Sequence, residues 1–254
     1  MKKSRSTAPS HPALTEAASL LLKELVILAE ASQEISAELS VEKLLQLIVE
    51  RARSLVGCQY AALGVMDETK GIKSFITSGI DEASRKGIGD PPLGKGLLGL
   101  EANAPLRIDD VSKHPSAAGF PSGHPLMKTF LSVSIRYADK TFGNLYLTEK
   151  AGGQPFSEVD AQLITMFAAQ AGVALENARL FAETERQQRE AIQERLSLEA
   201  ILNSMAEGIY TLDADWRITR VNLHAARMLG KQPQDIVGLR CWEAFPYQTL
   251  NGRS

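Results

Sequence analysis

Two side chains in the middle of the sequence could take part in ligand chemistry. His124 stands between two prolines in a loop that leads into the apolar residues 130–131. A histidine that a rigid backbone holds beside apolar side chains can coordinate a haem iron, although it can equally be an ordinary loop residue. Tyr146 lies in the alternating segment 144–148 and faces away from its apolar neighbours. If that face is buried, the hydroxyl needs a hydrogen-bond partner, which could be a ligand; a half-exposed strand tyrosine would need none.

Other patterns of catalytic or nucleotide-binding residues are incomplete in this sequence. Segment 94–99 has the GxGxxG spacing, but residues 90–92 before it are Asp-Pro-Pro instead of the apolar strand that a dinucleotide site requires. The four histidines lack metal-ligand spacing, and neither Cys58 nor Cys241 has a histidine nearby in the sequence. There is no GxSxG motif, no phospho-acceptor histidine motif and no kinase ATP-binding box. We therefore expect no enzymatic activity, and we interpret the glycines as a tight loop near a pocket.

The composition indicates a globular protein. The chain has 254 residues, of which 44% are hydrophobic and 23% charged, and its formal net charge is −2. This balance argues against a nucleic-acid binder. The longest uncharged stretch, 161–175, is shorter than the roughly 20 residues of a spanning helix. With two cysteines and no signal-peptide core, we expect a cytoplasmic protein without membrane contact, whose residues 1–13 form a disordered tail.

Three helices are expected from the hydrophobic pattern. Residues 14–39 place apolar side chains in alternating steps of four and three, interrupted at Ser32, which is the pattern of a coiled coil. This favours dimerisation through 14–39, and the alternative is an amphipathic helix packed on its own domain. A second helix is expected at 41–56. A long third helix over 157–205 begins apolar and becomes polar, which is typical of a paired connector and predicts a further homodimer contact.

Strand-like segments lie between these helices and after them. The expected strands of the first domain are 60–66, 72–77, 105–109, 130–137 and 142–149. Turn residues connect most of them directly, so the sheet is predicted to be mainly antiparallel and the fold class α+β. Beyond the long helix, 209–212 and 218–221 predict a hairpin, after which too few residues remain to complete a sheet. We thus expect a domain at 40–182, a helical connector at 183–198 and an incomplete domain at 199–254.

Several segments of the first domain match a known pattern. They are YAALGV at 60–65, GKGLLG at 94–99, PLRIDDV at 105–111, HP at 114–115, GFP at 119–121, HP at 124–125, FGNLYLTEK at 142–150 and ENARL at 176–180. Residues 40–182 thereby resemble a GAF domain, and more closely the first GAF domain of the DevS/DosT-type haem sensor kinases. Residues 199–254 resemble the start of a PAS domain, through EGI at 207–209, Asp213, Ile218, Asn222, Ala225-Ala226, Leu229-Gly230 and Gly238.

The resemblance to the haem sensors implies roles for two residues. In those sensors the proximal haem ligand is a histidine that follows a Phe-Pro pair and precedes a proline, and His124 occupies that place. A tyrosine on a later strand contacts the bound gas through its hydroxyl, and Tyr146 matches that position. Leu126 stands where the family has a second proline. The resemblance therefore implies a haem cofactor, with a diatomic gas or a redox state as the signal.

Together these features predict the sensory input region of a bacterial signal-transduction protein. A two-component sensor histidine kinase is the type that the resemblance implies, with its kinase output domain missing from this chain. One alternative is a GAF domain that binds another small ligand such as a cyclic nucleotide, although the Asn-Lys-Phe-Asp-Glu signature is not apparent. Another is a dimerisation module without a ligand. A bilin photoreceptor is disfavoured because no Cys-His pair is present for chromophore attachment.

Overall fold

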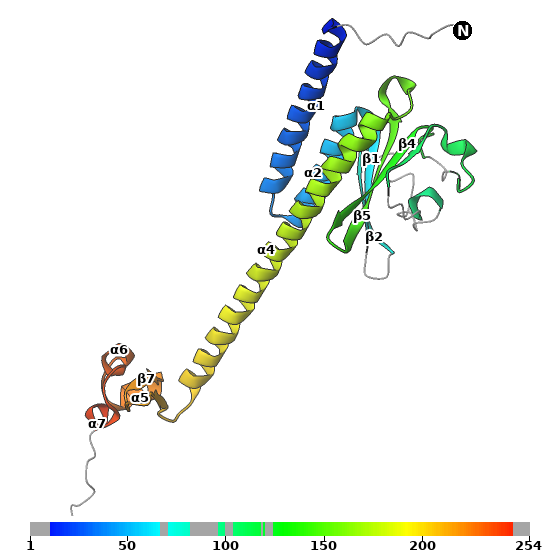
Figure 1. Cartoon of the computed structure of the whole chain (residues 1–254). Coiled ribbons are helices and arrows are strands. Elements are labelled where there is room, and N and C mark those ends of the chain that lie inside the picture. The colour runs from blue at the N-terminus through cyan, green and yellow to red at the C-terminus, as the bar shows by residue number, and fades with distance from the viewer. Residues whose placement is uncertain are drawn as a thin grey trace, which may run out of the picture. The chain divides into compact units, whose positions relative to one another are not determined.

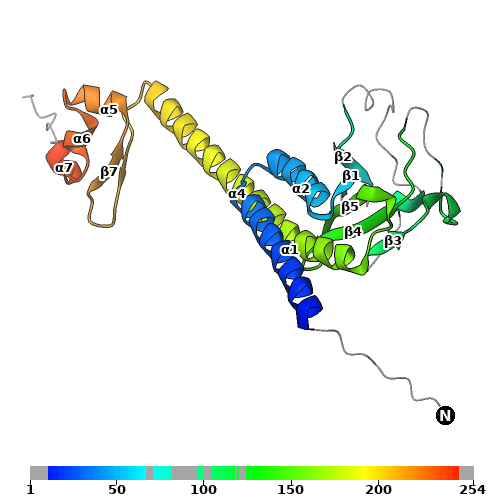
Figure 2. The same cartoon turned by 90° about the horizontal axis from the view of Figure 1, so that it is seen from above.

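The computed structural model describes residues 11–66, 71–81, 96–99, 104–117, 119 and 124–245. These residues belong to two compact units, one spanning Met1–Ala182 and the other Glu183–Ser254. Helix α4 (Glu158–Ser204) begins in the first unit and ends in the second. Figures 1 and 2 show the elements of each unit. In this described part of the chain, no helix is long and apolar enough to span a membrane.

An antiparallel sheet forms the centre of the first unit. Its strands, among the described residues, are β1 (Cys58–Met66), β2 (Ile72–Ser78), β3 (Leu106–Ile108), β4 (Phe130–Tyr137) and β5 (Lys140–Lys150). They lie in the order β2-β1-β5-β4-β3, and every neighbouring pair is antiparallel. The predicted fold class, α+β with a mainly antiparallel sheet, is confirmed.

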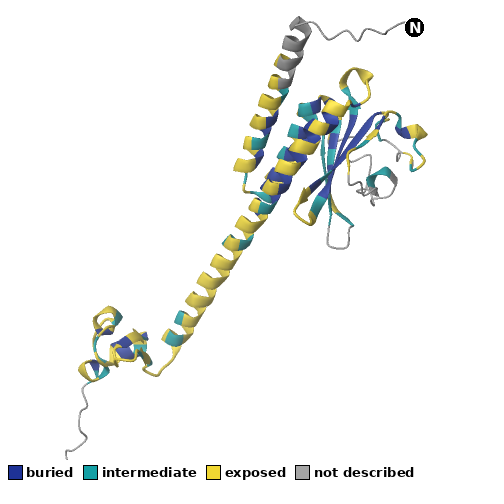
Figure 3. Cartoon of the chain, viewed as in Figure 1, coloured by how far each residue is buried: buried dark blue, intermediate teal, exposed yellow. Residues whose placement is uncertain are grey.

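Helices cover one face of this sheet. Helix α2 (Val41–Val56) ends at Gly57, whose φ of 60° lies in the left-handed region that glycine adopts without strain. Leu145 and Leu147 of β5 point to this side and join a core that includes Ile48 and Phe167. Figure 2 shows α2 and α4 on this side of the strands, and in Figure 3 much of the sheet is dark blue. This packing supplies most of the hydrophobic core of the unit.

Helix α4 begins with reciprocal capping bonds between Ser157 and Asp160. The hydroxyl of Ser157 accepts a hydrogen bond from the Asp160 N–H, and the Asp160 carboxylate accepts from the Ser157 N–H at 2.7 Å. Further along, Gly172 allows α4 to approach the sheet closely. A Cβ atom at this position would lie 2.1 Å from the carbonyl oxygen of Arg136 in β4, a distance that no side chain tolerates. The helix backbone therefore rests directly on the β4–β5 hairpin.

Helix α1 (His11–Ala37) packs against its own unit in its C-terminal half. Leu28 and Ile35, two positions of the predicted coiled-coil pattern, are buried in the same core as the sheet and α2. They therefore pack as the amphipathic alternative predicts and are not available to a second chain. Leu25 and Leu39, which belong to the same pattern, remain exposed. The earlier positions of the pattern have side chains outside the described residues.

The second unit contains the predicted hairpin and a capped helix. Strands β6 (Tyr210–Leu212) and β7 (Ile218–Val221) are antiparallel, and α5 (Leu223–Met228), α6 (Pro233–Ile236) and α7 (Cys241–Ala244) follow them. The buried Asn222 side chain holds this unit together through four hydrogen bonds. Its oxygen accepts from the N–H groups of Ile209 and Ala225, and its nitrogen donates to the carbonyls of Leu202 and Glu207. Asn222 thus caps α5 and also bonds to the end of α4.

A pair of substitutions in α1 tests its packing on the first unit. Ile35 is 0% exposed and Ile27 is 50% exposed, so the same change has different consequences at the two positions. Ile35→Ala is expected to lower the free energy of unfolding by about 2–5 kcal/mol because it leaves a cavity in the core. Ile27→Ala should change it by about 0.5 kcal/mol or less. Urea denaturation of both variants measures the difference, and equal losses would contradict the described packing.

Candidate functional site

The sheet face opposite the helices carries one of the two predicted ligand residues. Because side chains alternate along a strand, Asn144, Tyr146 and Thr148 of β5 point away from Leu145 and Leu147. An apolar cluster covers this face. Its members are Ile108, Val111, Phe130 and Tyr146, with the partly buried Ala62, Phe75, Leu97, Leu98 and Leu106 packed against them. We call this the loop face, since Leu97 and Leu98 come from the 3-10 turn η1 (Gly96–Gly99) and Val111 from η2 (Val111–Lys113).

Tyr146 is buried at the centre of the loop face. Its ring lies 6.2 Å from that of Phe75 and 6.0 Å from that of Phe130, measured between centroids. Its hydroxyl donates a hydrogen bond of 2.6 Å to the carbonyl oxygen of Leu98 in η1. Burial raises the pKa of the Tyr146 phenol, and the neighbouring Asn144 amide opposes this rise. In this structure the hydroxyl is therefore neutral at ordinary pH and bound to backbone.

Asn144 is a polar residue of the loop face that the sequence analysis did not identify. Its side-chain oxygen accepts a hydrogen bond of 2.7 Å from the Ser134 hydroxyl on β4. The residue is only 2% exposed, and its side-chain nitrogen has no hydrogen-bond partner. The signal in the sequence was its position two residues before Tyr146, which places both side chains on the same face.

His124 lies in the segment that leads into β4. Its Nδ1 is 2.7 Å from the carbonyl oxygen of Pro125. A carbonyl oxygen can only accept, so Nδ1 is the donor in this contact. His114 has the reverse arrangement, because its Nδ1 accepts the N–H of Ser116 at 3.2 Å. The two loop histidines therefore differ in the role of Nδ1, which donates in His124 and accepts in His114.

The segment that contains His124 is attached to the end of β5. The Thr148 hydroxyl contacts the sulfur of Met127 at 3.1 Å, and the Glu149 carboxylate accepts hydrogen bonds from the N–H groups of Lys128 and Thr129. Thr148 follows Tyr146 on the loop face. The structure therefore brings the His124 segment to the end of this face, whereas the Phe-Pro pair before it lies outside the described residues.

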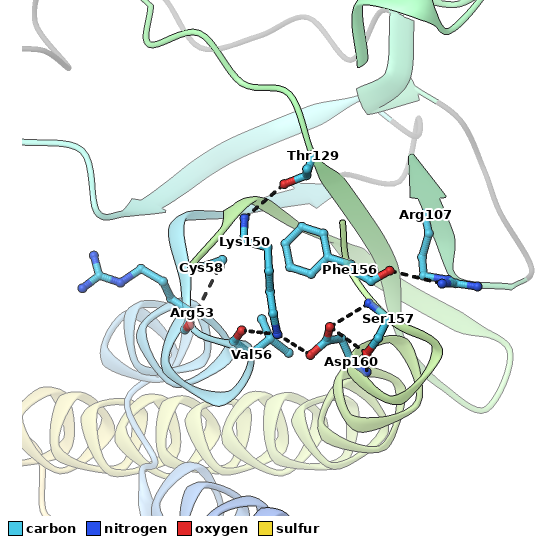
Figure 4. A network of polar contacts seen from close by, with 9 residues as sticks. All are labelled: Arg53, Val56, Cys58, Arg107, Thr129, Lys150, Phe156, Ser157 and Asp160. Carbon is cyan, nitrogen blue, oxygen red and sulfur yellow. Dashed lines mark hydrogen bonds and ion pairs between the residues drawn. The ribbon is translucent and has the colours of Figure 1, made fainter. Parts of the chain in front are cut away.

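A network of polar contacts joins β5 to the helices, as Figure 4 shows. The Lys150 ammonium donates to the Val56 carbonyl at 2.8 Å and to the Asp160 carboxylate at 2.6 Å. The backbone N–H of Lys150 donates to the Thr129 hydroxyl at 3.0 Å. The last residue of β5 thus contacts the end of α2, the first turn of α4 and the residue before β4. A displacement of β5 would reach α4 through these contacts.

The two cysteines and the acidic residues add no second site. Burial raises the pKa of the Cys58 thiol to about 12, so this thiol stays protonated and unreactive. Cys241 lies in the other unit. Within the described ranges, no group of three or more His, Cys, Asp or Glu side chains is arranged to hold a metal ion. The loop face is therefore the candidate functional site.

The first unit therefore has an antiparallel sheet with helices on one face and a loop-covered apolar cluster on the other, and the long helix α4 begins in it. Residues 38–176 match the family model described as GAF domain, and because this match covers more than half of the chain, the protein belongs to the GAF family. Residues 196–253 match the model described as PAS domain. Both are regulatory sensor domains, as the resemblance in the sequence implied.

Several solved structures share the fold of the first unit. The GAF domain of a phosphoenolpyruvate-protein phosphotransferase from Coxiella burnetii is 23% identical, with 64% of this chain and 98% of that chain covered and a TM-score of 0.55. The corresponding domain from Acinetobacter is also 23% identical, with 62% and 95% covered and a TM-score of 0.53. The second GAF domain of DevS from Mycobacterium smegmatis is 21% identical, with 59% and 99% covered and a TM-score of 0.42. The two phosphotransferase GAF domains, with TM-scores above 0.5, establish the fold and not a ligand.

The hydrogen bond between Tyr146 and η1 leads to a testable expectation. Tyr146→Phe removes the hydroxyl and leaves the Leu98 carbonyl without this donor. We expect a loss of about 1 kcal/mol in unfolding free energy and faster amide hydrogen exchange in η1. Denaturation and exchange measurements on both proteins check this, and unchanged exchange in η1 would contradict the role of the bond.

The same variant has a defined pH dependence. The pKa of Tyr146 is raised from 10.0 in the folded protein, so above pH 10 the phenol ionises more readily in the unfolded chain. The protonated Tyr146 phenol therefore contributes to the free energy of unfolding. This contribution is complete below pH 10 and is lost as the pH rises through the pKa of Tyr146 in the folded protein. Tyr146→Phe should lack this part of the alkaline destabilisation.

Proposed function

We propose that the first unit is a sensory domain that binds a small ligand on the loop face and regulates the output of a bacterial signal-transduction protein. A two-component sensor histidine kinase is the type of protein that we favour. The observation that carries the proposal is the burial of polar groups, Tyr146 and Asn144, among aromatic rings on the face that the helices leave uncovered. Binding sites for small molecules typically combine apolar walls with a few such polar groups.

The ligand that we propose is haem, with a diatomic gas or a redox state as the signal. The bond from Nδ1 of His124 to the Pro125 carbonyl supports this choice, because metal-binding histidines usually donate from the other ring nitrogen to such a partner. The rings and aliphatic side chains of the loop face suit a large apolar molecule. When bound, haem would supply an iron that binds diatomic gases. His124 would hold the iron, and the apolar cluster would exclude water.

Ligand binding on this face has a consequence for the η1 turn. Tyr146 donates its hydroxyl hydrogen to the Leu98 carbonyl, and Leu97 and Leu98 pack on the same cluster. A ligand that accepts a hydrogen bond from the Tyr146 hydroxyl must therefore replace Leu98 as its partner. The ligand would influence α4 only if it binds one arrangement of β5 and α4 more tightly than another. The contacts of Lys150 with Asp160 provide the physical connection between these two elements.

Absorption spectra test the haem proposal. Protein expressed with a haem precursor is expected to show a Soret band that shifts on reduction and on addition of carbon monoxide. His124→Ala should lose the band, whereas His114→Ala, the matched control, should keep it because its Nδ1 is occupied by Ser116. A band that survives in His124→Ala would exclude this histidine as the ligand. Absence of a band in the parent protein, even after addition of hemin, would exclude haem.

The partner that we propose for α4 is a second copy of this chain. Val159, Met166, Val173 and Leu180 recur every seven residues and are 49%, 51%, 40% and 49% exposed. The other side of the helix, including Phe167, is buried against the sheet. A seven-residue apolar repeat matches another repeat of the same period, as in a two-stranded coiled coil.

Polar residues beside this row are consistent with a parallel pair. Asn177 lies between Val173 and Leu180 on the same exposed side, and a single asparagine in such a seam favours a dimer in one register. Further along, Glu190 of one chain would lie opposite Arg195 of the other, and these charges are complementary. The ligand-free dimerisation module considered above would use the same row.

Substitutions in this row test the dimer. Val173→Glu places a charge in the proposed seam and is expected to convert the protein to a monomer at micromolar concentration. Val237→Glu is the matched control, because Val237 is 47% exposed and lies in the other unit. Sedimentation equilibrium measures both variants. A parent protein that is already monomeric, or a Val173→Glu variant that remains dimeric, would contradict the proposal.

A further inference from the structure

The side-chain amide of Asn144 is buried without its full set of hydrogen bonds. Its oxygen accepts from Ser134, while its nitrogen, which carries two N–H donors, has no partner of normal geometry. The Asn144 side chain also opposes the rise in the pKa of the neighbouring Tyr146 phenol. The phenol hydrogen is directed to Leu98, so the phenol oxygen can only accept, and this fixes which end of the amide faces it. Even a contact there would leave one of the two N–H donors unused.

Buried polar groups without partners are rare in folded proteins and are costly to keep. Asn222 in the second unit shows the usual arrangement, since it is 5% exposed and all four of its hydrogen bonds are made. On the loop face, the Tyr146 hydroxyl is bound to Leu98 and the Thr148 hydroxyl contacts Met127. Asn144 differs from these neighbours because a hydrogen-bond donor remains there for another molecule.

We infer that the Asn144 side chain donates a hydrogen bond to an acceptor atom of the ligand, the contact that the sequence analysis assigned to Tyr146. This inference rests on the proposed function of the loop face. The ligand class is a flat, unsaturated molecule that carries an acceptor oxygen, because the rings of Phe75, Phe130 and Tyr146 lie on the same face. Ser134 acts as a positioning residue, since its hydroxyl holds the amide oxygen.

The first experiment needs no ligand. Asn144→Ala and Asn222→Ala make the same change at two buried positions that differ in their hydrogen bonds. Asn222→Ala is expected to lower the unfolding midpoint of the second unit by several degrees, because four partners lose their bonds. Asn144→Ala should shift the midpoint of the first unit by less than a third as much. Calorimetry and hydrogen exchange assign each transition to its unit. Equal shifts would show that Asn144 has a structural role and would overturn the inference.

The second experiment uses two probes that carry acceptor oxygens, hemin and cyclic GMP, with the full chain. For a probe that binds the parent protein, Asn144→Ala is expected to weaken binding about tenfold. Asn144→Asp should weaken it at least as much, because it keeps the shape but replaces the donor with an acceptor. Tyr146→Phe should change the affinity less than Asn144→Ala does. Equal affinity of the parent and Asn144→Ala would overturn the inference.

The two experiments separate this inference from the proposed function. If neither probe binds the parent protein, the haem proposal and the cyclic-nucleotide alternative both fail, and the stability comparison alone decides the role of Asn144. If hemin binds and Tyr146→Phe weakens it more than Asn144→Ala does, the haem proposal stands and the donor is Tyr146. If Asn144→Ala has the larger effect on affinity and the smaller effect on stability, both proposals are supported.

Discussion

The alternation of side chains along β5 determines both faces of the first unit. Leu145 and Leu147 enter the core beneath the helices, while Asn144 and Tyr146 enter the cluster on the loop face. A shift of one residue in the pairing of β5 would exchange these two sets and would bury the polar groups under the helices. The long antiparallel pairings with β1 and β4 on either side hold the register against such a shift.

Through the ion pair between Lys150 and Asp160, the position of α4 also depends on the register of β5. Both groups are largely removed from water, and each has further partners, the Val56 carbonyl for the ammonium and Ser157 for the carboxylate. An ion pair in such surroundings contributes little net stability, but the loss of one partner leaves a charge that is costly to bury. Its effect is therefore to fix where the strand ends relative to the first turn of the helix.

Much of this arrangement could be predicted from local sequence. Patterns of only a few residues indicate which way Tyr146 faces and where three helices begin or end. The helix ends are marked by Ser157, Asn222 and Gly57. The partner of the Tyr146 hydroxyl could not be predicted, since Leu98 is 48 residues away and no pattern links the two positions. The packing of α1 was also ambiguous, because a repeat of apolar residues looks the same whether the helix packs on its own unit or on a second chain.

The close contact at Gly172 limits how α4 can move. The helix backbone lies against the Arg136 carbonyl because glycine has no side chain there. Rotation of α4 about its own axis by one residue would bring Ala171 or Val173 to this point, and either side chain would collide with the carbonyl. Tilting the helix or shifting it along the hairpin is compatible with the contact only while Gly172 stays near it. Within the first unit, α4 can therefore tilt around this point, whereas a twist about the helix axis is blocked there.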